Sequence, residues 1–227
     1  EWYKKFQKKL NFKLDKVILA IPSIEGIKYA FFFTKHSKEL LIANKESIIC
    51  GGKVLLSSAK LNKCKITSID SEHYCIAQSL LENKMEEVEA VYLTASGGPF
   101  LGRESKSYSK ASIKKVTNHP SWNMGEKISV DSATLVNKIF ELIEAHVLYG
   151  IPANKIKIKI HKESLAHSAI VLKNGLVKLL MHDTTMSIPI RNSLFDNMYF
   201  SQKESFFLSK KKIILTSPNI IYKETSE

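Results

Sequence analysis

Residues 16–21 read KVILAI, a short continuous apolar run that ends at Pro22 and Ser23. Such a run is typical of a strand buried on both faces of a parallel sheet. A helical pattern at residues 24–34 follows it, and a second apolar run, ELLIA, occupies residues 39–43. We therefore predict a strand–helix–strand crossover over residues 16–43, which indicates an α/β fold.

Two strand ends in this region carry polar side chains. We expect a helix that follows residues 44–47 and continues to about residue 60, and a strand at residues 64–69. Open α/β sheets bind ligands where their strands end, so a site is expected beyond residues 43 and 69. The polar residues at these two places are Asn44, Lys45, Glu46 and Asp70.

The pattern changes after Ser71. We expect helices at residues 73–81 and 133–149, the second capped by Ser132, and a lysine-rich segment at 106–117 that is helical in its second half. Strands are expected at 89–95, 156–160 and 176–181, with a short strand or turn at 165–169. Loops are expected at 96–100, which is glycine-rich, and at 119–125, which is aromatic.

The composition excludes several classes of protein. The net charge of +12 comes from lysines scattered along the chain, without the arginine-rich helix or aromatic platform of an RNA-binding protein. We therefore expect no specific nucleic-acid binding. No apolar run reaches the roughly 18 residues of a membrane span, so no membrane association is expected. Three cysteines without C-x-x-C spacing argue against a disulfide framework and fit a reducing compartment.

Three acidic residues have the spacing of a candidate metal site. Asp70 and Glu72, one residue apart at a strand end, can direct both carboxylates into one cleft. Glu141 lies on a predicted helix with Asn137 and Lys138 one turn before it. An oxygen-only ligand set favours Mg²⁺ or Mn²⁺ over Zn²⁺.

Each acid could instead end a strand or pair with a lysine on a solvated face. The helix that carries Glu141 is otherwise so apolar that it leaves little surface on which a charge could be solvated. That setting favours the metal interpretation.

Five motifs in order and spacing together resemble one enzyme family, 1-deoxy-D-xylulose-5-phosphate reductoisomerase. The resemblance extends from about Asp15 to Phe195. The motifs are ANKES at 43–47, DSEH at 70–73, SGGPF at 96–100, HPSWNMG at 119–125, and DSAT at 131–134 followed by Asn137, Lys138 and Glu141. The resemblance implies rearrangement and reduction of 1-deoxy-D-xylulose 5-phosphate to 2-C-methyl-D-erythritol 4-phosphate, with NADPH and Mn²⁺ or Mg²⁺, in non-mevalonate isoprenoid biosynthesis.

The resemblance also implies roles for individual residues. The implied metal ligands are Asp70, Glu72 and Glu141. The implied substrate-binding residues are Lys45, Ser71, Glu72, Ser96, His119, Ser132, Asn137, Lys138 and Glu141, with Lys45, Glu72 and His119 as the catalytic groups. The implied cofactor contacts are Asn44, Glu46 and Gly125, and the implied flap residues are Trp122 and Met124. We assign no chemistry to His161 and His167, because a lone histidine is more often a packed one.

The expected fold class is α/β. The resemblance implies the end of a Rossmann-like NADPH-binding domain at 1–69, an α+β catalytic domain with a flap loop at 70–195, and a divergent linker or tail at 196–227. The sequence has no counterpart of the family's glycine-rich nucleotide motif or of its helical C-terminal domain, so we expect a piece of a longer protein. Ile139 is bulky where the family usually has a small residue.

The resemblance further implies a homodimer acting on a small phosphorylated sugar, in a bacterial cytoplasm or a plastid-type organelle. Two alternatives stay open: a non-catalytic remnant that binds metal and phosphate, and a basic interaction module. Retention of every predicted ligand favours the enzyme.

Overall fold

The computed structural model describes residues 12–101, 111–117, 125–196 and 216. The chain divides into two compact units. The first contains residues 1–70 and 189–197, and the second contains residues 71–188 and 198–227. This division neither tests nor replaces the three functional domains expected from the sequence, which stay a prediction.

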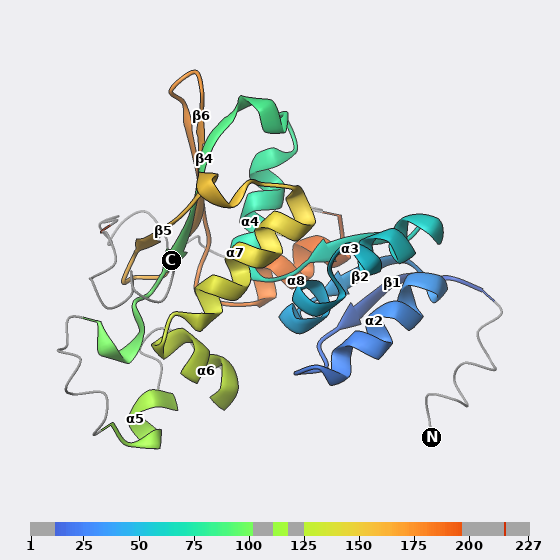
Figure 1. Cartoon of the computed structure of the whole chain (residues 1–227), viewed down its shortest axis with the longest axis horizontal. Coiled ribbons are helices and arrows are strands. Elements are labelled where there is room, and N and C mark those ends of the chain that lie inside the picture. The colour runs from blue at the N-terminus through green and yellow to red at the C-terminus, as the bar shows by residue number, and fades with distance from the viewer. Residues whose placement is uncertain (1–11, 102–110, 118–124, 197–215, 217–227) are drawn as a thin grey trace. The chain divides into compact units, whose positions relative to one another are not determined.

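The first unit has a three-stranded parallel sheet in the order β1-β2-β3 (Figure 1). Its strands are β1 (Leu14–Leu19), β2 (Ser37–Ile42) and β3 (Lys65–Ser68). Helix α2 (Glu25–His36) connects the first pair and α3 (Lys45–Leu61) the second. The strand–helix–strand crossover and the α/β class are therefore confirmed.

The central position of β2 explains its apolar sequence. It pairs with β1 on one edge and β3 on the other, and Leu40, Leu41 and Ile42 are buried. Glu39 is the buried charged residue of β2. Its carboxylate accepts a hydrogen bond from Thr67 Oγ1 at 2.6 Å and lies 2.8 Å from Lys65 Nζ, both on β3.

The second unit has a four-stranded mixed sheet in the order β5-β4-β6-β7. Strand β4 (Val88–Ala95) runs parallel to β5 (Ile156–Ile160) and antiparallel to β6 (Ala166–Leu172), which pairs with β7 (Val177–Met181). The segment expected to be a short strand or turn at 165–169 is therefore most of a seven-residue central strand.

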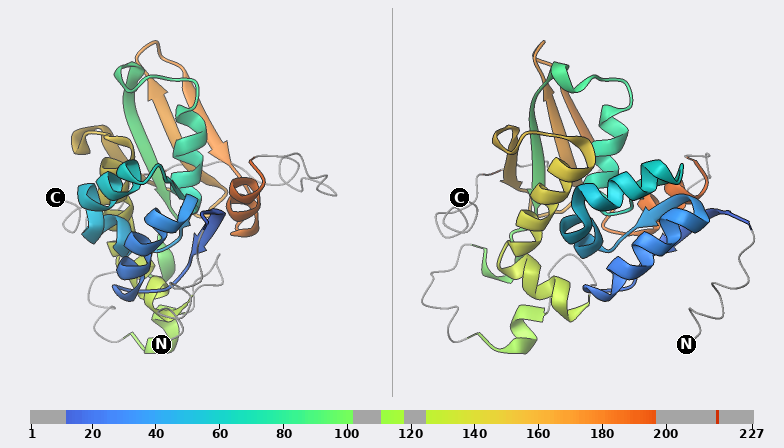
Figure 2. Two further views of the ribbon diagram at one scale, coloured as in Figure 1. Left: turned by 90° about the vertical axis from the view of Figure 1, so that its right-hand side faces the viewer. Right: turned by 45° about the vertical axis from the view of Figure 1, so that its right-hand side comes forward.

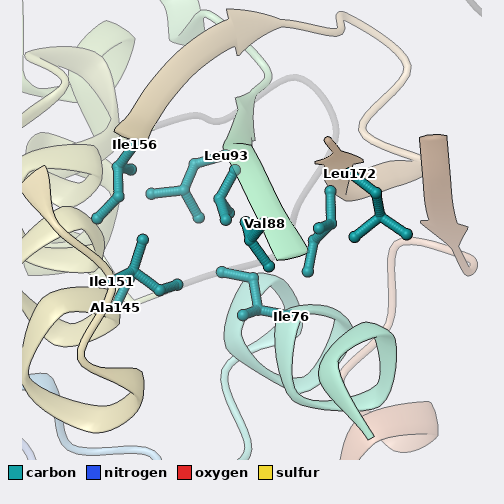
Figure 3. Close-up of a cluster of buried hydrophobic side chains, with 9 residues drawn as sticks. Ile76, Val88, Leu93, Ala145, Ile151, Ile156 and Leu172 are labelled. Carbon is teal, nitrogen blue, oxygen red and sulfur yellow. The ribbon is translucent and has the colours of Figure 1, made fainter. Parts of the chain in front are cut away.

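Helices α4 (Ser71–Leu80) and α7 (Val136–Tyr149) meet the sheet of this unit in one hydrophobic core (Figures 2 and 3). Ile76 comes from α4, Leu93 from β4, Ala145 from α7 and Ile170 from β6. Further members of the cluster are Val88, Val91, Ile151, Ile156 and Leu172. This core fixes the two helices that carry the acidic residues Glu72 and Glu141.

The expected helix at 133–149 is wrong at its start. Residues 126–133 form a separate helix, α6 (Glu126–Ala133), so Ser132 lies inside α6 and does not cap α7. Helical backbone is interrupted at Leu135, whose φ is +60°, and α7 begins at Val136. Burial of the Leu135 side chain with Ala95 and Ile160 offsets the left-handed backbone, which only the tertiary structure reveals.

The remaining elements are short. Helix α5 (Ile113–Thr117) confirms that the second half of the lysine-rich segment is helical. Helix α8 (Ser187–Leu194) is not expected from the sequence; its Pro189 lies in the first turn, where a missing N–H costs no hydrogen bond. Single turns of 3₁₀ helix are η1 (Met85–Glu87), η2 (Gly98–Phe100) and η4 (Ala153–Lys155). None of the helices in the described part of the chain has the length and apolar content to cross a membrane.

The setting of Glu39 predicts a pH-dependent contribution to stability. Burial raises its pKa, but hydrogen bonds from Lys65 and Thr67 and the charges of Lys65 and Lys16 outweigh burial and hold the pKa below its usual 4.5. A lowered folded-state pKa gives stability that is present above pH 4.5 and is lost as the pH falls through the folded value.

Glu39→Gln should therefore lower the urea midpoint at pH 7, and the difference from the wild type should shrink below pH 4.5. Lys38→Gln is the control: Lys38 is the exposed residue before Glu39, and its substitution should change the urea midpoint little at pH 7 or below pH 4.5. A Glu39→Gln deficit that stays constant from neutral pH into the acid range would contradict this account.

Candidate metal centre

Three carboxylates converge at the start of α4 and the first half of α7. Asp70 follows β3, Glu72 is in the first turn of α4, and Glu141 is a buried residue of α7. One carboxylate oxygen from each acid can be chosen so that the three atoms lie within 4.8 Å of one another. Asp70 is joined to Glu72 through Ser71 alone, so the local chain holds these two acids near each other. The structure brings together the three acids that the sequence grouped, and their role as ligands stays a prediction.

The donor set fits a hard divalent cation. All three groups offer carboxylate oxygens, which Mg²⁺ and Mn²⁺ prefer, and among the described residues no cysteine or histidine belongs to this cluster. One acid of the three is almost fully buried, with Glu141 only 1% exposed. A carboxylate at such depth requires a compensating positive charge.

A buried lysine supplies positive charge to the acids of the second unit. The Nζ atom of Lys138 donates to Glu141 Oε2 at 2.6 Å and also to Glu72 Oε1. Asn137 Nδ2 donates to the other oxygen of Glu141. Lys138 is 5% exposed, so its ammonium group and the two carboxylates share an environment of low polarity. Helices α4 and α7 are thereby joined by charge as well as by apolar packing.

The first unit contains a similar pair. Lys45 is the first residue of α3, and its Nζ lies 2.5 Å from Asp70 Oδ2. The position of Lys45 is set by Asn44, whose side-chain oxygen accepts from the Ser47 backbone N–H at 2.8 Å and so caps the helix. Asn44 Nδ2 donates to the Ser23 carbonyl at 2.9 Å and to Glu46 Oε2 at 3.0 Å.

Gly26 is the residue that allows this cap to form. A Cβ atom at position 26 would lie 2.6 Å from Asn44 Oδ1 and 2.9 Å from the Ile21 carbonyl oxygen. A side chain there would displace the cap of α3 and with it Lys45. The close approach of backbone to side chain therefore requires glycine.

Three serines are also predicted from the sequence to bind substrate, and the structure describes all of them. Ser71 is buried at the start of α4, and its hydroxyl donates to Glu72 Oε2. Ser96 follows β4, and its hydroxyl accepts from the Gly98 N–H at 3.3 Å. Ser132 lies near the end of α6 and close to that glycine loop, since a Cβ at Gly98 would lie 3.2 Å from the Ser132 carbonyl oxygen.

Gly125 is the residue before α6. His119, Trp122 and Met124 lie outside the described residues. The structure therefore joins Glu72, Asn137, Lys138 and Glu141 through direct contacts, and places Ser96 and Ser132 on two adjoining segments of the same unit.

Two groups of buried histidines lie near these acids and have no role predicted from the sequence. His73 and Glu144 form a buried pair between α4 and α7, with 3.3 Å between Nε2 and Oε2. His167 on β6 stacks on His182, with ring centroids 3.8 Å apart, and its Nε2 lies 3.1 Å from the His182 carbonyl oxygen. Burial lowers the pKa of His167 to about 4; the charge of Glu72 and the hydrogen bond to the His182 backbone oppose this shift, and the charges of His182 and Lys138 assist it. A neutral, packed ring agrees with assigning it no chemistry.

Fold and site together define an α/β protein whose mixed-sheet unit carries a buried carboxylate–lysine cluster suited to a divalent cation. Two family models match the chain and together cover more than half of it. The model of the 1-deoxy-D-xylulose 5-phosphate reductoisomerase C-terminal domain matches residues 66–149, and the 1-deoxy-D-xylulose 5-phosphate reductoisomerase model matches residues 7–52. The chain belongs to the 1-deoxy-D-xylulose 5-phosphate reductoisomerase family.

Individual relatives agree. The 1-deoxy-D-xylulose 5-phosphate reductoisomerase of Pelagibacter ubique is 43% identical over 187 residues, which are 82% of this chain and 48% of the relative. That of Clostridium kluyveri is 37% identical over 91% of this chain and 54% of the relative. The chain thus spans about half the length of the curated relatives it matches.

Solved structures give the same result. A crystal structure of DOX-P reductoisomerase in complex with NADPH, fosmidomycin and magnesium matches with a TM-score of 0.84 and 31% identity, over 92% of this chain and 55% of the other. The Zymomonas mobilis 1-deoxy-D-xylulose 5-phosphate reductoisomerase in complex with NADPH matches with a TM-score of 0.86 and 27% identity, over 98% and 58%.

The buried His167 predicts a second effect of pH on stability. Its folded-state pKa of about 4 lies below the ordinary 6.5, so protonation favours the unfolded chain. The stability associated with neutral His167 is complete above pH 6.5 and is lost between pH 6.5 and about 4, by up to about 3 kcal/mol.

His167→Asn should be less stable than the wild type at pH 7, and this deficit should narrow as the pH falls from 6.5 to about 4. Chemical denaturation at a series of pH values measures it. His146→Asn, the same substitution at an exposed position of α7, is the control and should lower the stability at pH 7 less than His167→Asn does. Parallel pH profiles for the wild type and His167→Asn would contradict the assignment.

Proposed function

We propose that this chain provides the metal- and substrate-binding part of a 1-deoxy-D-xylulose 5-phosphate reductoisomerase. The reaction is the NADPH-dependent rearrangement and reduction of 1-deoxy-D-xylulose 5-phosphate to 2-C-methyl-D-erythritol 4-phosphate in non-mevalonate isoprenoid biosynthesis. The observation that carries the proposal is the convergence of Asp70, Glu72 and Glu141 beside Lys138, in a chain 43% identical to a relative of that name.

Asp70, Glu72 and Glu141 would hold Mg²⁺ or Mn²⁺. When bound, the cation supplies Lewis-acid polarisation of the carbonyl and hydroxyl oxygens of the substrate. The oxygen-only donor set supports this choice of metal, as does the magnesium in the complex of a similar DOX-P reductoisomerase. Asn137 and Lys138, which donate to Glu141, would orient its carboxylate toward the cation.

The remaining groups would position the substrate. Ser96, Ser132, Asn137, Lys138 and His119 would bind its phosphate and backbone oxygens, and Lys45 and Ser71 would contact the reacting part. Donors fixed on a dianionic phosphate use its binding energy to orient the reacting carbons. In this proposal Lys45, Glu72 and His119 are the catalytic groups, and Lys45 is already held in place by the cap at Asn44.

The first unit would bind part of NADPH. Its parallel sheet carries Asn44 and Glu46 just after β2, where open α/β sheets bind ligands. Gly125 would contact the same cofactor, and Trp122 with Met124 would form a flap that excludes water before hydride transfer. We also propose residues 1–69 as the cofactor domain, 70–195 as the catalytic domain and 196–227 as a linker or tail. A homodimer in a bacterial cytoplasm or plastid-type organelle completes the proposal.

The experiment is an assay of NADPH oxidation by the purified chain with 1-deoxy-D-xylulose 5-phosphate and Mn²⁺, with EDTA as the metal-free control. Oxidation that needs both substrate and metal supports the proposal. A chain that binds Mn²⁺ but oxidises no NADPH would contradict turnover by this chain and favour a remnant that retains only the binding site.

Substitution of one ligand tests the metal site within the same assay. Glu141→Gln keeps the shape and the hydrogen-bond acceptor of the side chain but removes its charge, so turnover at fixed Mn²⁺ should fall by more than the roughly 10-fold that loss of a group orienting a ligand costs. Glu82→Gln, a change of the same kind at an exposed acid, should leave turnover unchanged. Full activity in Glu141→Gln would remove this residue from the ligand set.

A further inference from the structure

A buried polar contact joins α4 to α7 outside the proposed ligand set. His73 is 0% exposed and Glu144 is 2% exposed, and His73 Nε2 lies 3.3 Å from Glu144 Oε2. Burying an imidazole and a carboxylate is costly unless each meets a group of opposite character. The pair therefore holds one geometry between the two helices, and a separated arrangement would leave both groups desolvated.

A second contact ties the same two helices together. The hydroxyl of Tyr149, in the last turn of α7, donates to the His73 carbonyl oxygen at 2.9 Å. The rings of His73 and Tyr149 also lie near each other, with centroids 5.9 Å apart. His73 is thus held by α7 through its side chain and through its backbone.

These contacts lie directly beside the proposed ligands. His73 follows Glu72 on α4, and Glu144 is one turn beyond Glu141 on α7. Apolar packing of the helices on the core around Ile76 and Ala145 is non-directional and tolerates small slides. The hydrogen bond from Tyr149 to the His73 carbonyl oxygen tolerates them far less, because hydrogen bonds weaken steeply with distance and angle.

We propose that Glu144 and Tyr149 are positioning residues for the metal centre. Acting through His73, they fix α4 against α7 so that the carboxylates of Glu72 and Glu141 face one cation. This proposal rests on the proposed metal-binding role of Glu72 and Glu141. Groups that orient metal ligands without touching the metal typically change its affinity by about 10- to 100-fold when removed.

Tyr149→Phe is the sharpest variant, because it removes one hydroxyl and keeps the ring. Titration with Mn²⁺, followed by the electron paramagnetic resonance of the free ion, should give a dissociation constant about 10-fold weaker than the wild type. Tyr92→Phe is the matched control: Tyr92 lies on β4, where its ring faces Lys157 Nζ at 5.8 Å, and its loss of a hydroxyl should leave Mn²⁺ affinity unchanged.

Glu144 provides a graded pair of variants. Glu144→Gln keeps a polar side chain of the same shape beside His73, and Glu144→Leu removes its polar atoms. We expect Mn²⁺ affinity to fall in the order wild type, Glu144→Gln, Glu144→Leu, and the thermal midpoint of the metal-free chain is to be measured for each. Near-wild-type Mn²⁺ affinity in Glu144→Gln, with a clear loss in Glu144→Leu, would identify the polar contact of residue 144 with His73, and not the charge of Glu144 alone, as the positioning element.

The outcomes separate this proposal from the proposed function. Unchanged Mn²⁺ affinity in Tyr149→Phe and Glu144→Leu, with lowered metal-free stability, would overturn the proposal and leave these residues purely structural. A wild type that binds no Mn²⁺ would overturn it as well, because the ligand set would then be wrong. A wild type that binds Mn²⁺ without oxidising NADPH would contradict the enzyme function only, and the affinity measurements would still decide the positioning role.

Discussion

The contact on which the second unit depends is the ion triad of Lys138, Glu72 and Glu141, in which Lys138 and Glu141 are buried and Glu72 is half-buried. Two carboxylates this close repel each other, and the ammonium of Lys138 between them makes their burial possible. Removing one member of a buried pair costs about 3–5 kcal/mol, because the remaining charge has no compensation. The triad therefore constrains α4 and α7 to the spacing that brings their acids together.

Other contacts in the second unit help to maintain this spacing between α4 and α7. The core around Ile76, Leu93 and Ala145 presses both helices on the sheet, and the contact of Glu144 with His73 continues the polar line one turn further along α7. In the first unit, the cap at Asn44 has a comparable role for Lys45, and it is possible only because Gly26 lacks a side chain. The side chains proposed to bind metal and substrate, such as Glu141 and Lys45, are thus held in place by residues that we assign no part in the chemistry.

Much of this fold could be predicted from the sequence, and the failures have physical causes. Apolar runs predict β1, β2 and β4 to within about two residues, since strands buried in a sheet leave a local signal. The break between α6 and α7 leaves none, because the strained backbone at Leu135 is compensated by burial against residues distant in sequence. Helix α8 escapes prediction because its eight residues are fewer than the roughly 11 in which a helical period of apolar residues can be recognised.

The candidate site also contains residues that the sequence predicts and residues that only the fold reveals. Asp70, Glu72 and Glu141 can be found because motif spacing and an apolar helix make isolated acids conspicuous, and the structure brings them together. The position of Glu144 in that same apolar helix gives an equal signal, but its partner His73 lies on a helix far earlier in the chain and only the fold shows the contact. The roles of His119, Trp122 and Met124 stay predictions, because they lie outside the described residues.

A crystal of this chain grown with Mn²⁺ and measured for anomalous scattering by manganese tests the metal centre directly. We expect one strong anomalous peak within coordination distance, about 2.0–2.6 Å, of carboxylate oxygens from Asp70, Glu72 and Glu141. A peak bound elsewhere, or no peak beside a triad that keeps Lys138 between its acids, would contradict the assignment of these residues as the metal centre.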